Sequence, residues 1–592
     1  MPPGDAVNSP NFGGPSAGDE GCLLKRAVLV SLALLAAGPV AAAEMQAPKI
    51  TLNGINWDAA AASLNGHSGE APAEIFTRLN AITEKRFAGV GKSAVPVLLP
   101  FDVEAFRKDV ADSNADAATS EKYFGGFHPT KFFLPGPAGY DATFTLNKEA
   151  DGLNIDFDKP IVFEISGAAF VYELDPPNNV EKEDTPKELQ GKFPGIRRIL
   201  SEAHVRYAFE RFGVPYVLSI QCYDRPPSPR HLSCREAEPL ALRFLNSLHT
   251  AGGAPAKIAQ PAIDLRRPEA KSDFTYYSPG DLIENSGWEK MPGRADYHVY
   301  ARMRFPIADA PGYVKSQSFM PWGDCYHTAI AGRRGRKGAI YHCKLNDKPL
   351  VFDESAAENF TYPWRDNFCE LRDFLVGQCP GGYGHQGEDI RPGNCVLNNP
   401  EADRCLPYRH TVAAVQDGAI RRMPGNIGLY IVVNSANERV RFRYLHMDPK
   451  IMDADGLLNG RQVREGEIIG KVATWGDFEN GTSYHLNFNI QVFTSIGWVW
   501  VNPYMTLVAA YERLIGGRGT EIMPGEPAPP VPDKPPVILH PEPMPATPAP
   551  AISASPPPRP AIQKKDKEKI TERAKPRRHH RIHRRHHHRH HE

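Results

Sequence analysis

Three short segments in the last third of the chain carry residue types that bind metal ions or transfer protons. The first runs from His385 to Asp389 (HQGED), the second ends at His446 (YLH), and the third runs from His485 to Asn487 (HLN). Imidazole and carboxylate groups are the ligands that zinc prefers alongside thiolate. Together, the three His and one Asp match the inventory of a mononuclear zinc site.

The first segment can serve one ion only if the chain bends inside it. His385 and Asp389 are four residues apart, which would separate them by ~13 Å in a straight strand. Gly387 lies between them and permits a bend that other residues resist. We therefore expect a turn or kink at Gly387 that brings both side chains to one point.

The third segment lies in SYHLNFNI, residues 483–490, which alternates polar and apolar residues. In a strand this alternation puts His485, Asn487 and Asn489 on one face and the apolar residues on the other. A single His at a strand end is most often an ordinary surface residue. The inference therefore depends on the combination of segments and on their order.

That combination resembles the lysostaphin-like (LytM-type) zinc metallopeptidases, which cut peptide bonds in bacterial cell-wall peptidoglycan. The family pattern is H-x-x-x-D, then Tyr-x-His, then V-x-x-G-x-x-I-G-x-V, then H-x-H. Over about residues 380–505 the chain offers HQGED, YLH, VREGEIIGKV (463–472) and HLN in the same order.

The resemblance implies a mainly antiparallel β domain of the duplicated hybrid motif type. It also implies one zinc ion held by His385, Asp389 and the third position of the last motif. His446 and His485 would orient the attacking water, shuttle its proton and stabilise the oxyanion. An open fourth position on the metal would lower the pKa of bound water toward ~7.

The chain departs from the family at Asn487, where the family has its third zinc ligand, a His. An amide offers only a neutral carbonyl oxygen, so Asn487 is a weak or lost ligand and zinc affinity should fall. Two functions remain open at this point. One is a zinc endopeptidase that acts on peptidoglycan, and the other is a non-catalytic LytM-type module that binds peptidoglycan or regulates another cell-wall hydrolase.

The start of the chain has the pattern of a secretory signal peptide. Lys25 and Arg26 precede an apolar run that ends with three Ala before Glu44, and the run is shorter than the ~20 residues of a membrane span. We expect export to the periplasm or cell envelope and no transmembrane span in the mature form. Removing Cys22 from the nine cysteines leaves eight, an even number that predicts disulfides, mainly between sequence neighbours.

At 592 residues the chain is too long for one core, so we expect several domains. A mixed α+β N-terminal domain should precede a disulfide-rich middle region with two Trp-containing phrases, PWGDC and PWRDNFC. These phrases could be an aromatic ligand platform or, as we favour, Trp-anchored loops held by disulfides. The expected parts are an upstream extension (1–22), the signal peptide (23–43), the N-terminal domain (44–250), a linker (251–270), the middle region (271–371), the LytM-type domain (372–518), a Pro-rich linker (519–562) and a basic tail (563–592).

Local patterns predict several elements. Apolar spacing predicts a helix over about 75–87 and another over 199–212, and Asn502-Pro503 with Gly516-Gly517 predicts a third between them. VREGEIIGKV predicts a β-hairpin around its Glu-Gly turn. Short apolar runs predict the strands 94–99, 161–165, 215–220, 412–415, 429–433, 440–444 and 467–472.

The end of the chain differs in charge from the rest. Residues 563–592 hold 12 Lys and Arg against 4 Asp and Glu, a net of +8, so the remainder carries 57 − 65 = −8. With 16 Pro in 524–560, we expect an extended linker followed by a disordered His/Arg-rich tail. Its eight His could bind metal, its charge could hold it on anionic envelope surfaces, or it could be a solvated tail with neither role; no nucleic acid partner is expected in an exported protein.

Overall fold

The computed structural model divides the chain into two compact units, residues 1–543 and 544–592. All the described residues belong to the first unit. The predicted signal peptide, the upstream extension, most of the Pro-rich linker and the basic tail lie outside them. The described ranges are 44–64, 70–111, 121–146, 160–174, 182–184, 187–201, 204–222, 232–282, 295–315, 324–331, 337–345, 348–349, 363–370, 385–392, 408–422, 431–475 and 484–527.

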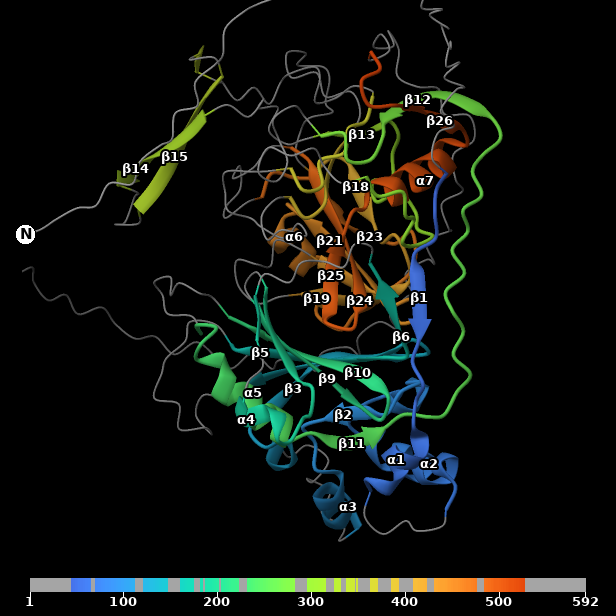
Figure 1. Ribbon diagram of the computed structural model, residues 1–592, viewed down its shortest axis with the longest axis vertical. Helices are drawn as coiled ribbons and strands as arrows, with labels where there is room; N and C mark the ends of the chain where they lie inside the picture. Colours follow the sequence, from blue (N-terminus) through green and yellow to red (C-terminus); the bar gives the residue numbers. More distant parts are fainter. Residues whose placement is uncertain are drawn as a thin grey trace, which may run out of the picture. The chain divides into compact units, whose positions relative to one another are not determined.

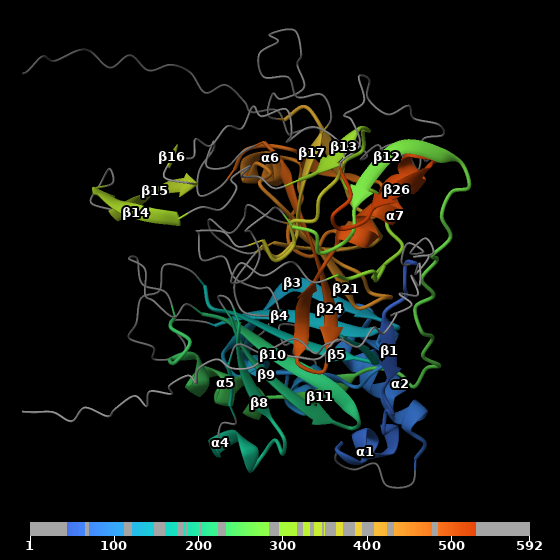
Figure 2. The ribbon, with the colours of Figure 1, turned by 45° about the horizontal axis from the view of Figure 1, so that its top comes forward.

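A seven-stranded antiparallel sheet dominates the first part of the chain (Figure 1). Its strands lie side by side in Figure 2, and two short strand pairs, β1–β6 and β2–β11, adjoin it in sequence. In spatial order the sheet contains β3 (Phe127–Gly136), β4 (Gly139–Leu146), β5 (Val162–Ala168), β10 (Val214–Gln221), β9 (His204–Arg211), β8 (Arg197–Ser201) and β7 (Lys182–Asp184). The pairs contain β1 (Lys49–Leu52), β6 (Phe170–Glu173), β2 (Val97–Leu99) and β11 (His249–Gly252).

Helices accompany this sheet. The predicted helix near residue 75 is present as α2 (Pro72–Thr83), which begins at a Pro and buries Ile75 and Leu79. None of the helices in the described part of the chain has the length and apolar character that a membrane crossing requires. The others in this part are α1 (Trp57–Ala62), α3 (Val103–Ala111), α4 (Lys187–Gln190) and α5 (Ala237–Asn246).

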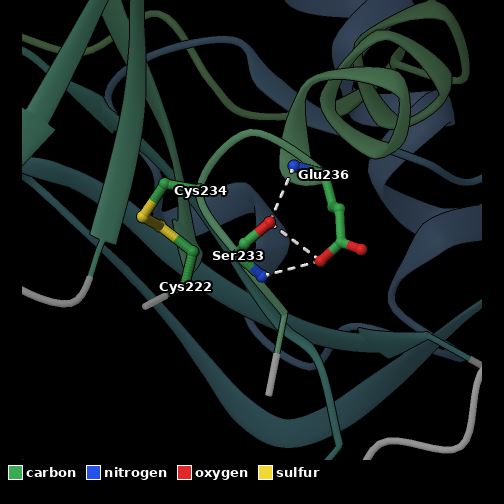
Figure 3. The surroundings of a disulfide bond; sticks show 4 residues. All are labelled: Cys222, Ser233, Cys234 and Glu236. Atoms are coloured by element: carbon green, nitrogen blue, oxygen red, sulfur yellow. Dashed lines mark hydrogen bonds between the residues drawn. A yellow bond between two sulfur atoms is a disulfide. The ribbon is translucent and has the colours of Figure 1, made fainter. Parts of the chain in front are cut away.

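A disulfide joins Cys222 to Cys234, twelve residues apart, just before α5 (Figure 3). This confirms the expected link between sequence neighbours for that pair. Ser233 and Glu236 bond reciprocally beside it: Ser233 donates from its backbone N and its Oγ to Glu236 Oε2, and Glu236 N donates to Ser233 Oγ. The Ser-x-x-Glu pattern is that of a capping box at a helix start.

An eight-stranded sheet forms the second part and carries the three candidate segments. Smaller groups are β18 with β23, β12 with β26, and β14 with β15 and β16. In spatial order the sheet contains β13 (Gly312–Val314), β17 (Glu388–Pro392), β24 (Leu486–Thr494), β21 (Val440–Leu445), β20 (Ile431–Asn434), β19 (Gly418–Arg422) and β22 (Gln462–Val463), with β25 (Gly497–Val501) also on β24. The smaller groups contain β18 (Thr411–Ala413), β23 (Ile468–Lys471), β12 (Lys271–Tyr277), β26 (Arg518–Ile522), β14 (Asp324–Ala331), β15 (Lys337–Leu345) and β16 (Lys348–Pro349). The helices are α6 (Pro449–Ala454) and α7 (Tyr504–Ile515).

Strands from the predicted middle region pair with a strand of the predicted LytM-type region and with β26, which begins at the last residue of that region and continues into the predicted Pro-rich linker. β12 runs parallel to β26, and β13 is antiparallel to β17. Trp364 of the PWRDNFC phrase is buried and donates from Nε1 to the carbonyl of Gly312, and Cys369 is disulfide-bonded. These observations fit the Trp-anchored loop rather than the platform for this phrase. The domain boundaries themselves stay predictions.

Several local expectations are confirmed and two are wrong. α7 starts after Pro503 and ends at Gly516, whose φ of 66° gives the left-handed cap that Gly allows. The predicted helix over 199–212 is instead β8 and β9, and Val205, Tyr207 and Phe209 pack into one core from one face of β9 while Ala208 packs on the other face. The predicted hairpin in VREGEIIGKV has its turn, but β22 pairs with β19 and β23 with β18.

Candidate functional site

The bend expected between His385 and Asp389 brings the two side chains together. His385 Nε2 lies 3.4 Å from Asp389 Oδ1, and both residues are buried. A Cβ at Gly387 would lie 2.0 Å from Asn489 Nδ2 and 2.3 Å from the carbonyl oxygen of Phe488. Gly387 is therefore required by the close approach of β24.

β24 brings the third segment to the same point. Asp389 of β17 is the register partner of Asn487, and His485 Nε2 lies 3.1 Å from Asp389 Oδ1. Leu486 and Phe488 point into the core and are fully buried, which confirms the alternation expected from the sequence. One carboxylate oxygen thus lies within ion-pair distance of two imidazole rings.

His446 completes the group from the end of β21. Its ring centroid lies 4.7 Å from that of His485, and its Nδ1 lies 2.5 Å from the carbonyl oxygen of Trp475. Because a carbonyl only accepts, Nδ1 carries the proton of neutral His446. His446 also has a φ of 71°, a backbone conformation that is uncommon for residues other than Gly and clusters at functional sites.

The structure thus brings together all five residues singled out in the sequence, at a point where β17, β21 and β24 meet. Two further polar residues that the zinc hypothesis did not use border Asn487. Asn489 donates from Nδ2 to Asn487 Oδ1 at 2.9 Å, and Arg443 donates from Nε to Asn489 Oδ1 at 2.7 Å. Arg443 also donates to Gln386 Oε1 at 2.6 Å and lies 3.9 Å from the ring centroid of Trp500.

These contacts decide which way the amide of Asn487 faces. Arg443 has donors only, so the Asn489 atom next to it must be its oxygen. The Asn489 nitrogen then donates to the Asn487 oxygen, which leaves the Asn487 nitrogen facing His385 Nε2 at 2.7 Å. His385 in turn lies with Nδ1 3.0 Å from the carbonyl oxygen of Asn367, so Nε2 is the acceptor. The amide orientation therefore follows from a chain of donors and acceptors that begins at Arg443.

The residues fit a zinc ion at two positions and fail at the third. Two ligand atoms at about 2.1 Å from one tetrahedral zinc lie roughly 3.4 Å apart, which matches His385 Nε2 and Asp389 Oδ1. Asn487, however, presents an N–H group, which has no lone pair for a metal, and that group bonds to the very imidazole nitrogen that would ligate. In the described part of the chain, no group of three or more His, Cys, Asp or Glu side chains is arranged to hold a metal ion. The donor set does not fit zinc.

Asp366 and Glu388 form a buried pair of carboxyl groups, and Glu388 belongs to the first segment. Burial and the neighbouring Asp366 carboxyl raise the pKa of Glu388 well above its usual range, and burial also raises the pKa of Asp366. The pair therefore keeps a proton at a higher pH than an ordinary carboxyl group does. No local pattern predicts this pair, because the two residues lie 22 positions apart.

Comparisons with known proteins find solved structures that resemble the chain only weakly. No family model and no curated protein matches the sequence. A structure from Ruminococcus gnavus assigned as a glycyl-glycine endopeptidase LytM is 21% identical, with a TM-score of 0.17, over 23% of this chain and 49% of that one. CbpA from L. salivarius is 22% identical, with a TM-score of 0.13, over 23% of this chain and 84% of that one.

Csd3 from Helicobacter pylori is 16% identical, with a TM-score of 0.15, over 30% of this chain and 41% of that one. The chain thus spans less than half the length of the R. gnavus and H. pylori proteins. The TM-scores are too low for these likenesses to indicate a function, so the residues of the site are the basis for assigning one.

Proposed function

We propose that this is an exported LytM-type protein that binds peptidoglycan peptides at the site around Asp389 and does not hydrolyse them with zinc. The observation that carries the proposal is the 2.7 Å hydrogen bond from the Asn487 amide to His385 Nε2. The Asn487 amide occupies the position at which the family that this sequence resembles has its third zinc ligand. The peptidoglycan part of the proposal rests on the four motif segments and their order.

The remaining site residues support a retained binding role. Asp389 contacts both His385 and His485, and hydrogen bonds to Asn367 also hold His385 and Asp389. His446 is only partly buried and lies against His485, which leaves an imidazole next to solvent. A partly exposed imidazole next to a buried carboxylate can bind the amide and amine groups of a peptide through hydrogen bonds.

Export is supported by the leader-like sequence and by the disulfides. Cys222 and Cys234 are bonded to each other, and Cys369 is also disulfide-bonded. Structural disulfides persist in oxidising compartments and are rare in reducing ones. We propose the periplasm or cell envelope as the location.

The test measures zinc and turnover in full-length protein. A His-rich tail is expected to bind some metal itself, so zinc at the site is measured as the difference between wild type and His385→Ala, which share the tail. We expect no difference in zinc content, no release of peptides from isolated sacculi with zinc supplied, and sedimentation of the protein with the sacculi. One equivalent of zinc lost in His385→Ala would refute the proposal. So would peptide release by the wild type.

The second candidate is a zinc endopeptidase, favoured by the His385–Asp389 spacing and by the paired His446 and His485 rings. If the wild type releases peptides, His446→Ala and His485→Ala should each lower turnover by roughly 10²-fold or more. Sacculus binding should barely change in either variant. Protein that sediments with sacculi and stimulates a second wall hydrolase would instead assign the module a regulatory role.

A further inference from the structure

The PWRDNFC phrase lies beside the candidate site. Its Asp366 accepts hydrogen bonds from the backbone of Gly280 at 2.8 Å and from Asn502 Nδ2 at 2.7 Å. Trp364 is fully buried, and its ring lies 4.7 Å from that of Phe274 and 4.8 Å from that of Tyr511. Residues 363–370 are therefore fixed to the core on the side away from the site.

On the other side, this segment is bonded to the backbone of His385. Cys369 donates from its backbone N to the carbonyl of His385 at 2.8 Å, and His385 N donates to the carbonyl of Glu370 at 2.9 Å. Both backbone groups of His385 are thus bonded to residues outside the motif segments. The position of His385 depends on a part of the chain that precedes the family-like stretch.

Asn367 makes the most direct contacts. Its carbonyl oxygen lies 3.0 Å from His385 Nδ1, and its Oδ1 accepts from the backbone N of Asp389 at 3.0 Å. Its own backbone N donates to Glu388 Oε2 at 3.0 Å. One residue, only 1% exposed, therefore bonds to both functional residues of the HQGED segment and to the Glu between them.

We infer that Asn367 is the positioning residue of this site. Its carbonyl fixes neutral His385 as the Nδ1–H tautomer and leaves the Nε2 lone pair facing Asn487. Its side chain holds the Asp389 peptide so that the carboxylate stays between His385 and His485. The inference deepens the proposed function and rests on it for the identity of the ligand, but the positioning role itself does not require that function.

The side-chain contact can be removed while the carbonyl is kept. Asn367→Ala deletes the acceptor of the Asp389 N–H group and leaves that buried donor without its bond. Asn367→Asp keeps an oxygen at the same place and serves as the conservative rescue. Asn459→Ala is the matched control, because Asn459 Oδ1 likewise accepts from a backbone N–H group, that of Arg422 at 3.2 Å, away from the site.

The experiment uses full-length protein labelled with ¹⁵N-histidine, with the His385 signals assigned by comparison with His385→Gln. Wild type should show His385 as one neutral tautomer protonated at Nδ1. In Asn367→Ala we expect mixed tautomers, roughly tenfold faster exchange of the Asp389 amide, and roughly tenfold weaker sacculus binding, the scale of one lost buried hydrogen bond. Asn367→Asp should restore the Asp389 protection, and Asn459→Ala should match wild type in all three measurements.

The inference is overturned if Asn367→Ala leaves the His385 signals and the Asp389 exchange unchanged, or if Asn459→Ala changes them equally. If Asn367→Ala does not fold, the wild-type spectrum still decides, because an Nε2–H tautomer at His385 would contradict the arrangement. One equivalent of zinc lost in His385→Ala, or peptide release by the wild type, would refute the proposed function and leave the positioning role standing. If Asn367→Ala has the expected effects on the His385 tautomer and the Asp389 exchange but the wild type does not bind sacculi, only the assignment of peptidoglycan as the ligand is refuted.

Discussion

A buried network of charges joins the two sheets, and its disruption should destabilise the protein strongly. Asp141 of β4 accepts from Arg439 Nη1 at 2.9 Å and Nη2 at 3.2 Å, and from Arg441 Nη2 at 3.3 Å. Arg441 also bonds to Glu164 of β5, which Arg421 Nη2 approaches to 3.1 Å. Asp141, Glu164, Arg439 and Arg441 are all at most 3% exposed.

Aromatic rings complete the network on the arginine side. The Arg441 guanidinium carbon lies 3.6 Å from the ring centroid of Trp498, and that of Arg439 lies 4.8 Å from it. Burial lowers the pKa of Arg441 to about 10, which still leaves it charged at neutral pH. The pairing with carboxylates is therefore needed to offset the burial of these charges.

Asp141→Asn removes one charge and keeps the shape of the side chain. It leaves Arg439 buried without a carboxylate, and breaking a buried pair in this way costs about 3–5 kcal/mol. Deleting both partners, in Asp141→Asn with Arg439→Met, should cost less than the sum of the single changes, because the unpaired charge is then gone. Glu104→Gln, which breaks the exposed pair of Glu104 and Arg107, should change the free energy of unfolding by less than about 1 kcal/mol.

The network also predicts how stability depends on pH. Burial would raise the pKa of Asp141, but Arg439 and Arg441 outweigh it and hold that pKa below its usual value. A depressed carboxyl pKa contributes stability above the unfolded value of about 3.9, and the contribution is lost as pH falls through the folded value. Urea unfolding at pH 7 and below pH 4 measures both effects. The reasoning would be refuted if Asp141→Asn lost no more unfolding free energy than Glu104→Gln, or if its stability fell with acid as much as that of the wild type.

Three further predictions follow from the site, the disulfide and the tail. Asn487→His should raise zinc affinity at least tenfold, and Asn487→Asp should do the same with less change of shape. Competition with a zinc chelator measures the affinities, and Asn487→Leu is the control. Equal affinities in all variants would mean that residue 487 does not face the metal position. Replacing Cys222 and Cys234 with Ser should lower the free energy of unfolding by about 3 kcal/mol, because the unfolded chain gains the entropy of an open loop of this size. Urea denaturation of both proteins under non-reducing conditions measures the difference, and equal stabilities would refute this prediction. Protonation of the eight His of the tail should raise its net charge from +8 toward +16 below about pH 6. Sacculus binding should therefore strengthen from pH 7.5 to 5.5 and weaken with salt. Binding that is unchanged by truncation at residue 527 would show that the tail does not contribute to it.

The sequence was sufficient where the structure depends on local spacing. Buried strands such as β5 and β10 and the caps of α7 follow from periodicity and from Pro and Gly at the ends of elements. The segment of β8 and β9 has the apolar spacing of a helix because a strand that buries residues on both faces also places apolar residues three or four positions apart. The pairing of β12 with β26, some 250 positions along the chain, could not be read from local patterns at all.

The five motif residues could be grouped from the sequence, whereas the residues that orient them could not. His385, Asp389 and Asn487 are recognisable because their types and spacing imply one task. Arg443 and Asn367 act through contacts that exist only once β17, β21, β24 and the PWRDNFC segment are assembled. One local hint is that Arg441 and Arg443 alternate along β21, which places both on one face.

Asn487 fits its surroundings, because its amide bonds to both of its neighbours. Asn489 needs an acceptor for its Nδ2 once Arg443 has fixed its oxygen, and His385 Nε2 needs a donor once Asn367 has fixed its tautomer. An amide at residue 487 supplies the acceptor and the donor at once. A purely apolar residue there would leave buried polar groups on both sides unsatisfied, at about 1–3 kcal/mol each. Arg443, Asn489 and Asn487 are thus matched to one another, and this match explains how an amide at residue 487 lies among the His and Asp side chains of the site with its oxygen and its nitrogen both bonded.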